Sequence, residues 1–287
     1  MANPVKCFFA YPANPPWLSE TLEAAISKIN DNGSGTVEAM SWKDLRITGK
    51  VIVDEICSAI NDCDMFACDL TSANPNVLFE LGYAVARKKR IWITLDPSYD
   101  HAKVNLAKLQ FLTTVGYAGY ENAQHLANQF FREKPYEDLE STLYDSVIQS
   151  IVQTPSDSTE LFYLRSEVNT EASVHLSSRL QKSKMPLVVD DPQEVGSRTL
   201  AWYASKTYCA FAIVAHLLDE QRSTKFLHNE KCSFVSGMAY AFGRPLLMLA
   251  HAPYESPIDY RDLLVVHKTA ASCTSAVENW LISVEHN

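Results

Sequence analysis

The chain has 287 residues, of which 47% are hydrophobic and 21% charged, so it can bury a core and does not have the composition of a disordered protein. Its formal net charge of −9 argues against a general affinity for nucleic-acid backbones. The opening residues MANPVKCFFAYPANPPW show no signal-peptide pattern, and no apolar run is long enough to cross a bilayer. We therefore expect a cytoplasmic protein without a membrane partner.

The first half alternates between short apolar segments and amphipathic segments. Residue patterns predict strands at 5–11, 36–42, 64–70 and 90–96, followed by a short last strand after 108–117, and helices at 15–30, 50–62, 76–87 and 121–131. Strands that alternate with helices over short connections predict a parallel sheet with helices on both faces.

The second half repeats this outline. Segments 161–166, 171–182, 186–191 and 209–219 correspond to the first strand, first helix, second strand and third strand. In the clearest match, residues 79–99 align with residues 234–254, so that Phe79 and Phe234, and Gly82 and Gly237, are each 155 residues apart.

This repetition predicts an α/β protein of two tandem flavodoxin-like or Rossmann-like doubly wound domains. The domains are expected at residues 1–153 and 160–287, joined in the polar stretch TPSDSTE (154–160), with the second a degenerate copy. The halves differ where chemistry is expected: Val235 lies at the position of Glu80, and His216 lies opposite Asp69. The turn Asn-Pro-Asn (74–76) is replaced by HNEKCS (228–233), so we expect the first half to carry the activity.

Ligands of open parallel sheets bind outside the carboxyl ends of the strands, where the strand order reverses. Asp69 lies at such an end, and Glu80 is expected near the start of the following helix, facing solvent. The other candidates for substrate binding at this edge are Phe9, Tyr11, Trp42, Asn74 and Asn76.

These residue types fit attack at the anomeric carbon of a sugar. Cleavage of an N-glycosidic bond develops positive charge on the ribose ring, which a carboxylate such as Glu80 can stabilise or capture as an ester. Asp69 can orient hydroxyls or exchange protons, amides can hold a base edge, and aromatic rings can stack on the base.

Each candidate also has a purely structural interpretation. Glu80 can offset the helix dipole, Asn74 can cap the helix with Pro75 in its first turn, and Asp69 can cap a neighbouring loop. The seven scattered cysteines lack a paired motif and are expected to be buried free thiols of a reducing compartment. We expect no metal site and no cofactor.

The run INDCDMFACDLTSANPNVLFELGYAVARKKRIWITLD, with CFFAYP and SWKDLRITGKVI upstream, resembles the nucleoside 2-deoxyribosyltransferase-like superfamily and its TIR-like neighbours. The resemblance spans roughly residues 5–120. It implies metal-independent cleavage or transfer at an N-glycosidic bond, with Glu80 as the nucleophile and Asp69 positioning sugar or base. The family's transferases complete each site with groups from a neighbouring subunit that have no match here. Similar proteins act as bacterial antiphage effectors.

Three hypotheses follow for the function. The first is an N-glycosidase or deoxyribosyltransferase acting on a nucleoside, a nucleotide or an NAD-type dinucleotide. The second is a non-catalytic nucleotide-sensing or partner-binding subunit, and the third is an NAD-cleaving TIR-like effector activated by oligomerisation. Homo-oligomers or a larger defence complex are the expected assemblies.

Overall fold

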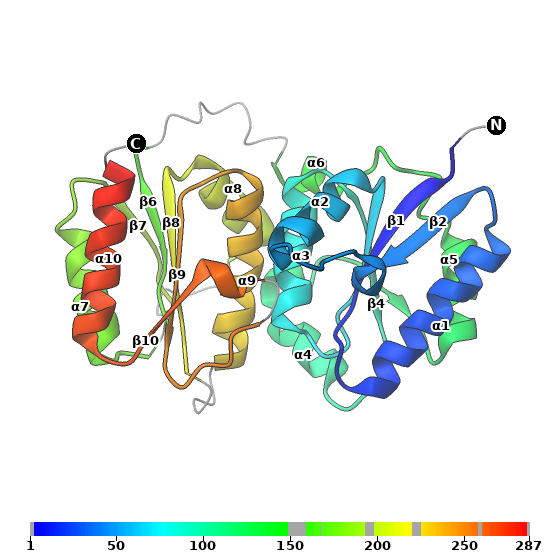
Figure 1. The fold of residues 1–287 in the computed structure, drawn as a ribbon, viewed down its shortest axis with the longest axis horizontal. Helices are drawn as coiled ribbons and strands as arrows, with labels where there is room; N and C mark the ends of the chain where they lie inside the picture. Colours follow the sequence, from blue (N-terminus) through cyan, green and yellow to red (C-terminus); the bar gives the residue numbers. More distant parts are fainter. Residues whose placement is uncertain are drawn as a thin grey trace.

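The computed structural model describes residues 3–148, 159–166, 168–192, 198–219, 225–257 and 260–285. Within these ranges it contains two five-stranded, all-parallel sheets with helices on both faces, which are two tandem Rossmann-like or flavodoxin-like domains (Figure 1). This confirms the predicted fold class. Residues 154–158 of the predicted linker lie outside the described residues.

The first sheet has the strand order β2-β1-β3-β4-β5, so its order reverses between β1 and β3. Its strands are β1 (Val5–Ala10), β2 (Val37–Ser41), β3 (Met65–Asp69), β4 (Arg90–Leu95) and β5 (Ala118–Gly119). Its helices are α1 (Pro16–Asn32), η1 (Trp42–Asp44), α2 (Ile52–Asp62), α3 (Pro75–Ala86), α4 (Ala102–Lys108), η2 (Gln110–Leu112), α5 (Ala123–Glu133) and α6 (Leu143–Ile148).

The second sheet has the order β10-β9-β8-β6-β7, which is the same topology. Its strands are β6 (Leu161–Leu164), β7 (Leu187–Asp190), β8 (Ala212–Leu217), β9 (Leu246–His251) and β10 (Leu264–His267). Its helices are α7 (Glu171–Gln181), α8 (Leu200–Cys209), α9 (Lys225–Ala241), η3 (Arg261–Leu263) and α10 (Ala270–Glu285). Residues 228–233, at the positions equivalent to the Asn-Pro-Asn turn, lie inside α9 and are therefore helical.

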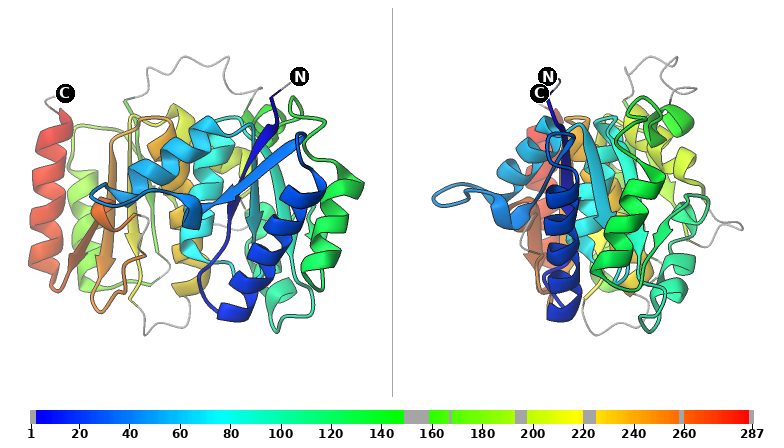
Figure 2. Two further views of the ribbon diagram at one scale, coloured as in Figure 1. Left: turned by 45° about the vertical axis from the view of Figure 1, so that its right-hand side comes forward. Right: turned by 90° about the vertical axis from the view of Figure 1, so that its right-hand side faces the viewer.

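The two domains are joined through helices α3 and α9, which lie side by side at the centre of the molecule (Figure 1). Each domain's outer face is covered by a helix pair, α1 with α5 at one end and α7 with α10 at the other (Figure 2, left). Hydrophobic residues of both domains form one continuous inner core, and a separate core lies under each outer helix pair.

Within the first sheet, alternate residues of each strand face these two cores. Phe66 and Cys68 of β3 belong to the inner core, whereas Met65 and Ala67 belong to the core under α1 and α5. This alternation decides on which face of the sheet a residue at the strand end lies.

Among the described residues, no helix combines the length and the apolar character needed to cross a membrane. The seven cysteines are free thiols, and all except Cys209 are buried. The expectation of buried thiols therefore holds for six of the seven cysteines.

Candidate functional site in the first domain

The loop between β3 and α3 is shaped by a strained residue and a helix cap. Ala73 has φ 47°, in the left-handed region that costs a non-glycine residue about 1–2 kcal/mol. The Asn74 side chain accepts hydrogen bonds from the backbone N–H groups of Asn76 (2.9 Å) and Val77 (3.5 Å), with Pro75 in the first turn. The structural interpretation of Asn74 as an N-cap is thus what the geometry shows.

Asp69 lies in a closed cage of hydroxyl groups at the end of β3. It accepts hydrogen bonds from the Thr71 backbone N–H (3.0 Å), the Thr71 hydroxyl (3.1 Å), the Thr94 hydroxyl (3.1 Å) and the Tyr120 phenol (2.8 Å). Its exposed fraction is 1%. Burial raises the pKa of Asp69 to about 6, although the hydrogen bonds from Tyr120, Thr71 and Thr94 oppose this rise.

Sequence reasoning missed Tyr120, Thr94 and Thr71 as the partners of Asp69. Tyr120 directly follows β5 at the same edge of the sheet as Asp69. The rule that places Asp69 at a ligand-binding edge would therefore have found Tyr120 as well, had the end of the short last strand been located.

Glu80 lies in the second turn of α3 and is 3% exposed, so the expectation of a solvent-facing carboxylate is wrong. Its neighbours are thiols of the inner core. Burial is the largest of the causes that raise the pKa of Cys57 to about 12, and the negative charge of Glu80 is the second largest. Burial raises the pKa of Cys68 well above its ordinary value, and the charges of Asp69 and Glu80 add to this rise.

The two carboxylates lie on opposite faces of the first sheet. Asp69 continues the row of Ala67, which faces the core under α1 and α5, whereas Glu80 lies beside Cys68 on the inner face. The structure brings both near Cys68 but does not place them in one shared cage. Any substrate that meets both must bind over the strand ends rather than on one face.

The aromatic candidates separate into two groups. Tyr11 and Trp42 lie beside each other, with ring centroids 6.3 Å apart, and Tyr11 directly follows β1. Phe9 instead packs on Trp92 and Phe130, at 6.2 and 6.3 Å, and is 2% exposed. In this structure the Phe9 ring is part of the hydrophobic core, and a substrate contact by it stays a prediction.

Two buried polar atoms at this edge have no hydrogen-bond partner among the described residues. They are the hydroxyl of Ser72 and the amide oxygen of Asn76. Both lie in or just after the loop that follows β3, beside the point where the strand order reverses. Buried polar groups without partners cost about 1–3 kcal/mol each, and a bound ligand is one way to satisfy them.

An acidic groove of about 530 Å³ opens at the same edge beyond β4. Asp96, Asp100 and Glu121 line it, together with the rings of Trp17 and Tyr99, whose centroids are 5.4 Å apart. The backbone N–H of Asp96 donates to the Thr71 hydroxyl at 2.8 Å, which links the groove to the cage of Asp69. Neither Asp69 nor Glu80 lines this groove.

Comparison of the chain with protein-family models, with curated protein sequences and with solved structures finds no match.

Proposed function

We propose that the first domain cleaves the N-glycosidic bond of a nucleoside, a nucleotide or an NAD-type dinucleotide, with Glu80 as the nucleophile. The observation that carries this proposal is a carboxylate that is 3% exposed at a position where the matching helix α9 has a valine. Phe79 and Gly82 recur in the second half as Phe234 and Gly237, but the counterpart of Glu80 is Val235.

Glu80 on α3 and Val235 on α9 occupy equivalent positions in two helices that pack in the same way. Helices α3 and α9 make the same close contact through their matching residues, and Val235 is fully buried at the position equivalent to Glu80. Burial of a carboxylate is costly where valine suffices, because the charged form loses its hydration. A residue retained at such a cost is a candidate for chemistry.

The reaction would proceed in two displacements. A carboxylate oxygen of Glu80 forms a bond to C1′ while the bond from C1′ to the base nitrogen breaks, and that nitrogen keeps the electron pair. A purine or pyrimidine base takes up a proton as it leaves, whereas nicotinamide, which is cationic in NAD, leaves as a neutral base without one. Water or a second base then attacks C1′ and loses a proton, and the Glu80 carboxylate is released. Water as acceptor makes the protein a hydrolase, and a base makes it a transferase.

Asp69 would act in proton transfer during this reaction. A pKa of about 6 lets the Asp69 carboxyl exchange a proton near neutral pH. Because its cage is closed by Thr71, Thr94 and Tyr120, it would reach a substrate through one of these hydroxyls and not directly. Because Glu80 is 3% exposed, a substrate reaches it only after the surrounding inner core opens locally.

The first experiment incubates the full-length protein with nucleosides, deoxynucleosides, their 5′-phosphates and NAD, and follows free base by chromatography. We expect base release by the wild type, none by Glu80→Gln, and an unchanged rate for Glu38→Gln, which alters an exposed glutamate on β2. Equal rates for wild type and Glu80→Gln would refute the proposed nucleophile.

A second experiment tests the covalent step. A 2′-fluorinated arabinonucleoside slows the second displacement, so the sugar should remain on the enzyme as an ester. Mass spectrometry of the digested protein should then find the added sugar on the peptide that contains Glu80. The sugar on another residue, with base release intact, would assign the nucleophile elsewhere.

A non-catalytic nucleotide-sensing or partner-binding role is the second candidate, and the burial of both carboxylates favours it. Glu80 is 3% exposed and Asp69 is 1% exposed, so neither carboxylate is accessible to a substrate in this conformation. Titration calorimetry with the same compounds distinguishes the two. Binding without base release, unchanged in Glu80→Gln, would support sensing.

A further inference from the structure

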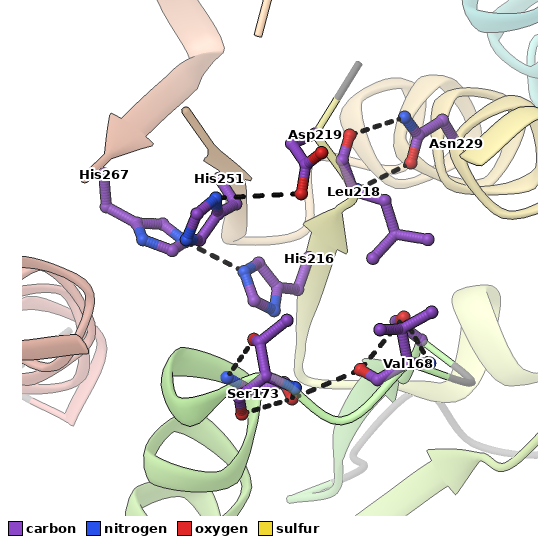
Figure 3. A network of polar contacts seen from close by, with 10 residues as sticks. Val168, Ser173, His216, Leu218, Asp219, Asn229, His251 and His267 are labelled. Carbon is purple, nitrogen blue, oxygen red and sulfur yellow. Dashed lines mark hydrogen bonds and ion pairs between the residues drawn. The ribbon is translucent and has the colours of Figure 1, made fainter. Parts of the chain in front are cut away.

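Three neighbouring strands of the second sheet each carry a histidine at the carboxyl end. His216 lies near the end of β8, His251 ends β9 and His267 ends β10 (Figure 3). His251 pairs directly with His267 in the strand register, and their rings lie 5.2 Å apart. The topology therefore gathers imidazoles at the edge where parallel sheets bind ligands.

Two of these histidines and a thiol lie close enough to share one ion. The Nε2 atoms of His216 and His267 are 2.9 Å apart. One ligand atom each from His216, His267 and Cys273, which lies on α10, are all within 4.8 Å of one another. The three residues are almost inaccessible to solvent, with exposed fractions of 2%, 2% and 0%.

The cluster has more ring nitrogens than hydrogen-bond partners. A neutral imidazole offers a lone pair on one ring nitrogen, and this is the form that binds metal ions. In the contact between His216 and His267, one nitrogen donates and the other accepts. The Nδ1 atom of His216 is buried and has no partner among the described residues. Buried polar atoms are rarely left unpaired, so this unpaired nitrogen indicates that a ligand binds at the cluster.

In the first domain, the strand positions equivalent to His216 and His267 contain a carboxylate and a tyrosine that are hydrogen-bonded to each other. Asp69 pairs with Thr94 and Thr94 with Ala118, while His216 pairs with Leu249 and Leu249 with Val265. These registers make His216 the counterpart of Asp69 and His267 that of Tyr120, and both pairs are 51 residues apart. The Asp69 pair is completed by threonine donors; the histidine pair has Cys273 beside it instead.

We propose that His216, His267 and Cys273 form a binding site for a divalent transition-metal ion, with zinc as the best fit. Two imidazoles and a thiolate are a donor set that zinc prefers, in a tetrahedral arrangement with one position left for water or another ligand. The site departs from the expectation of a metal-free protein, and it does not depend on the function proposed for Glu80.

His251 and Asp219 stand beside this site. The Nδ1 atom of His251 lies 3.8 Å from a carboxylate oxygen of Asp219, and the His251 side chain is 30% exposed (Figure 3). Zinc-binding histidines commonly have a carboxylate near their second ring nitrogen. His251 thus lies between the buried ligands and solvent, where it can fill or flank the fourth position.

The test titrates the tag-free, full-length protein with Co²⁺, which reports its ligands by absorption, and measures bound Zn²⁺ after gel filtration. We expect about one ion per chain. The Co²⁺ form should show the thiolate-to-cobalt charge-transfer band and the intense ligand-field bands of a four-coordinate site. A wild-type spectrum without the charge-transfer band would overturn the proposal, whatever the variants do.

Two variants and a matched control assign the ligands. Cys273→Ser should lose the charge-transfer band, and His267→Gln should weaken binding at least tenfold. Cys232→Ser replaces another buried thiol of the same domain, 3.5 Å from His228 and outside the cluster, and should bind like the wild type. Circular dichroism confirms that each variant is folded. Equal spectra for wild type and folded Cys273→Ser, or loss of the band in Cys232→Ser alone, would assign the metal elsewhere.

Discussion

Gly82 and Gly237 face each other's helix across the centre of the molecule, and neither position has room for a side chain. A Cβ atom on Gly82 would lie 2.0 Å from the backbone carbonyl oxygen of Phe234, and one on Gly237 would lie 1.9 Å from that of Phe79. The contact is reciprocal, like the interface of a symmetric dimer, although it lies within one chain. The paired glycines let α3 and α9 approach until their backbones touch.

Gly82→Ala should lower the free energy of unfolding by about 3 kcal/mol, because the obstructing atoms are backbone and cannot rotate away. The urea midpoint measures this loss. Gly116→Ala is the matched control, since a Cβ there meets nothing within 4 Å. Its stability should stay the same or rise by up to about 1 kcal/mol. Equal losses in both variants would contradict the close helix contact.

Glu80→Val should change the free energy of unfolding by less than about 1 kcal/mol, since valine fills the equivalent position of α9. The converse change, Val235→Glu, buries a new carboxylate in a fully buried site and should cost about 3 kcal/mol or more. Urea unfolding of both variants checks this prediction. A large loss in Glu80→Val would mean that Glu80 holds the structure.

Asp69 should make stability fall as pH rises between about 4 and 6. Its folded-state pKa of about 6 lies above the ordinary 3.8, so the folded state binds the proton more tightly. The favourable contribution is therefore full below pH 4 and lost above pH 6. As the pH rises over this range, the free energy of unfolding of the wild type should fall by about 3 kcal/mol relative to that of Asp69→Asn. A flat difference in urea unfolding from pH 4 to pH 7 would contradict the raised pKa.

Tyr120→Phe should destabilise the protein by about 2 kcal/mol at pH 7.5, because it removes a 2.8 Å hydrogen bond to an ionised carboxylate. Tyr260→Phe removes a 2.8 Å bond to the neutral Ser233 hydroxyl, and it should cost only about 1 kcal/mol. At pH 4, where Asp69 is protonated, the two losses should become similar. Thermal unfolding at both pH values makes the comparison.

Lys231→Met should cost about 3 kcal/mol, because it leaves Asp190 buried without its cation. The Lys231 ammonium lies 2.5 Å from the Asp190 carboxylate, and their side chains are 14% and 3% exposed. Lys50→Met breaks the exposed pair with Glu55 and should change stability by less than about 0.5 kcal/mol. If both variants unfold at the same urea concentration, the pair within the second domain contributes no more than a surface pair.

The local sequence determined most strands, most helices and the duplication, because apolar runs and helical periodicity are properties of neighbouring residues. The spacing of Phe79 and Gly82 from Phe234 and Gly237 revealed the repeat, and the structure shows that these residues form the contact between the halves. Sequence reasoning did not assign α8, β10 or α10, whose short or mixed apolar patterns resemble those of loops.

The candidate site followed from the sequence only in part. The order of β3, its loop and α3 placed Asp69, Asn74 and Glu80 together in the chain, but not the faces on which their side chains lie. Asp69 faces the outer helices and Glu80 the inner core, because successive strand residues point to opposite faces and α3 returns along the inner one. The burial of Glu80 has its cause in α9, which is more than a hundred residues away in the chain.

The histidine cluster depended on tertiary structure altogether. His216 and His267 are 51 residues apart, and the spacing of Cys273 from either matches no metal-binding motif. They meet because the carboxyl ends of parallel strands converge at one edge of a sheet and α10 returns over it. The sequence by itself determined which segments become strands and helices, whereas only the packing of two similar sheets decided which side chains share a site.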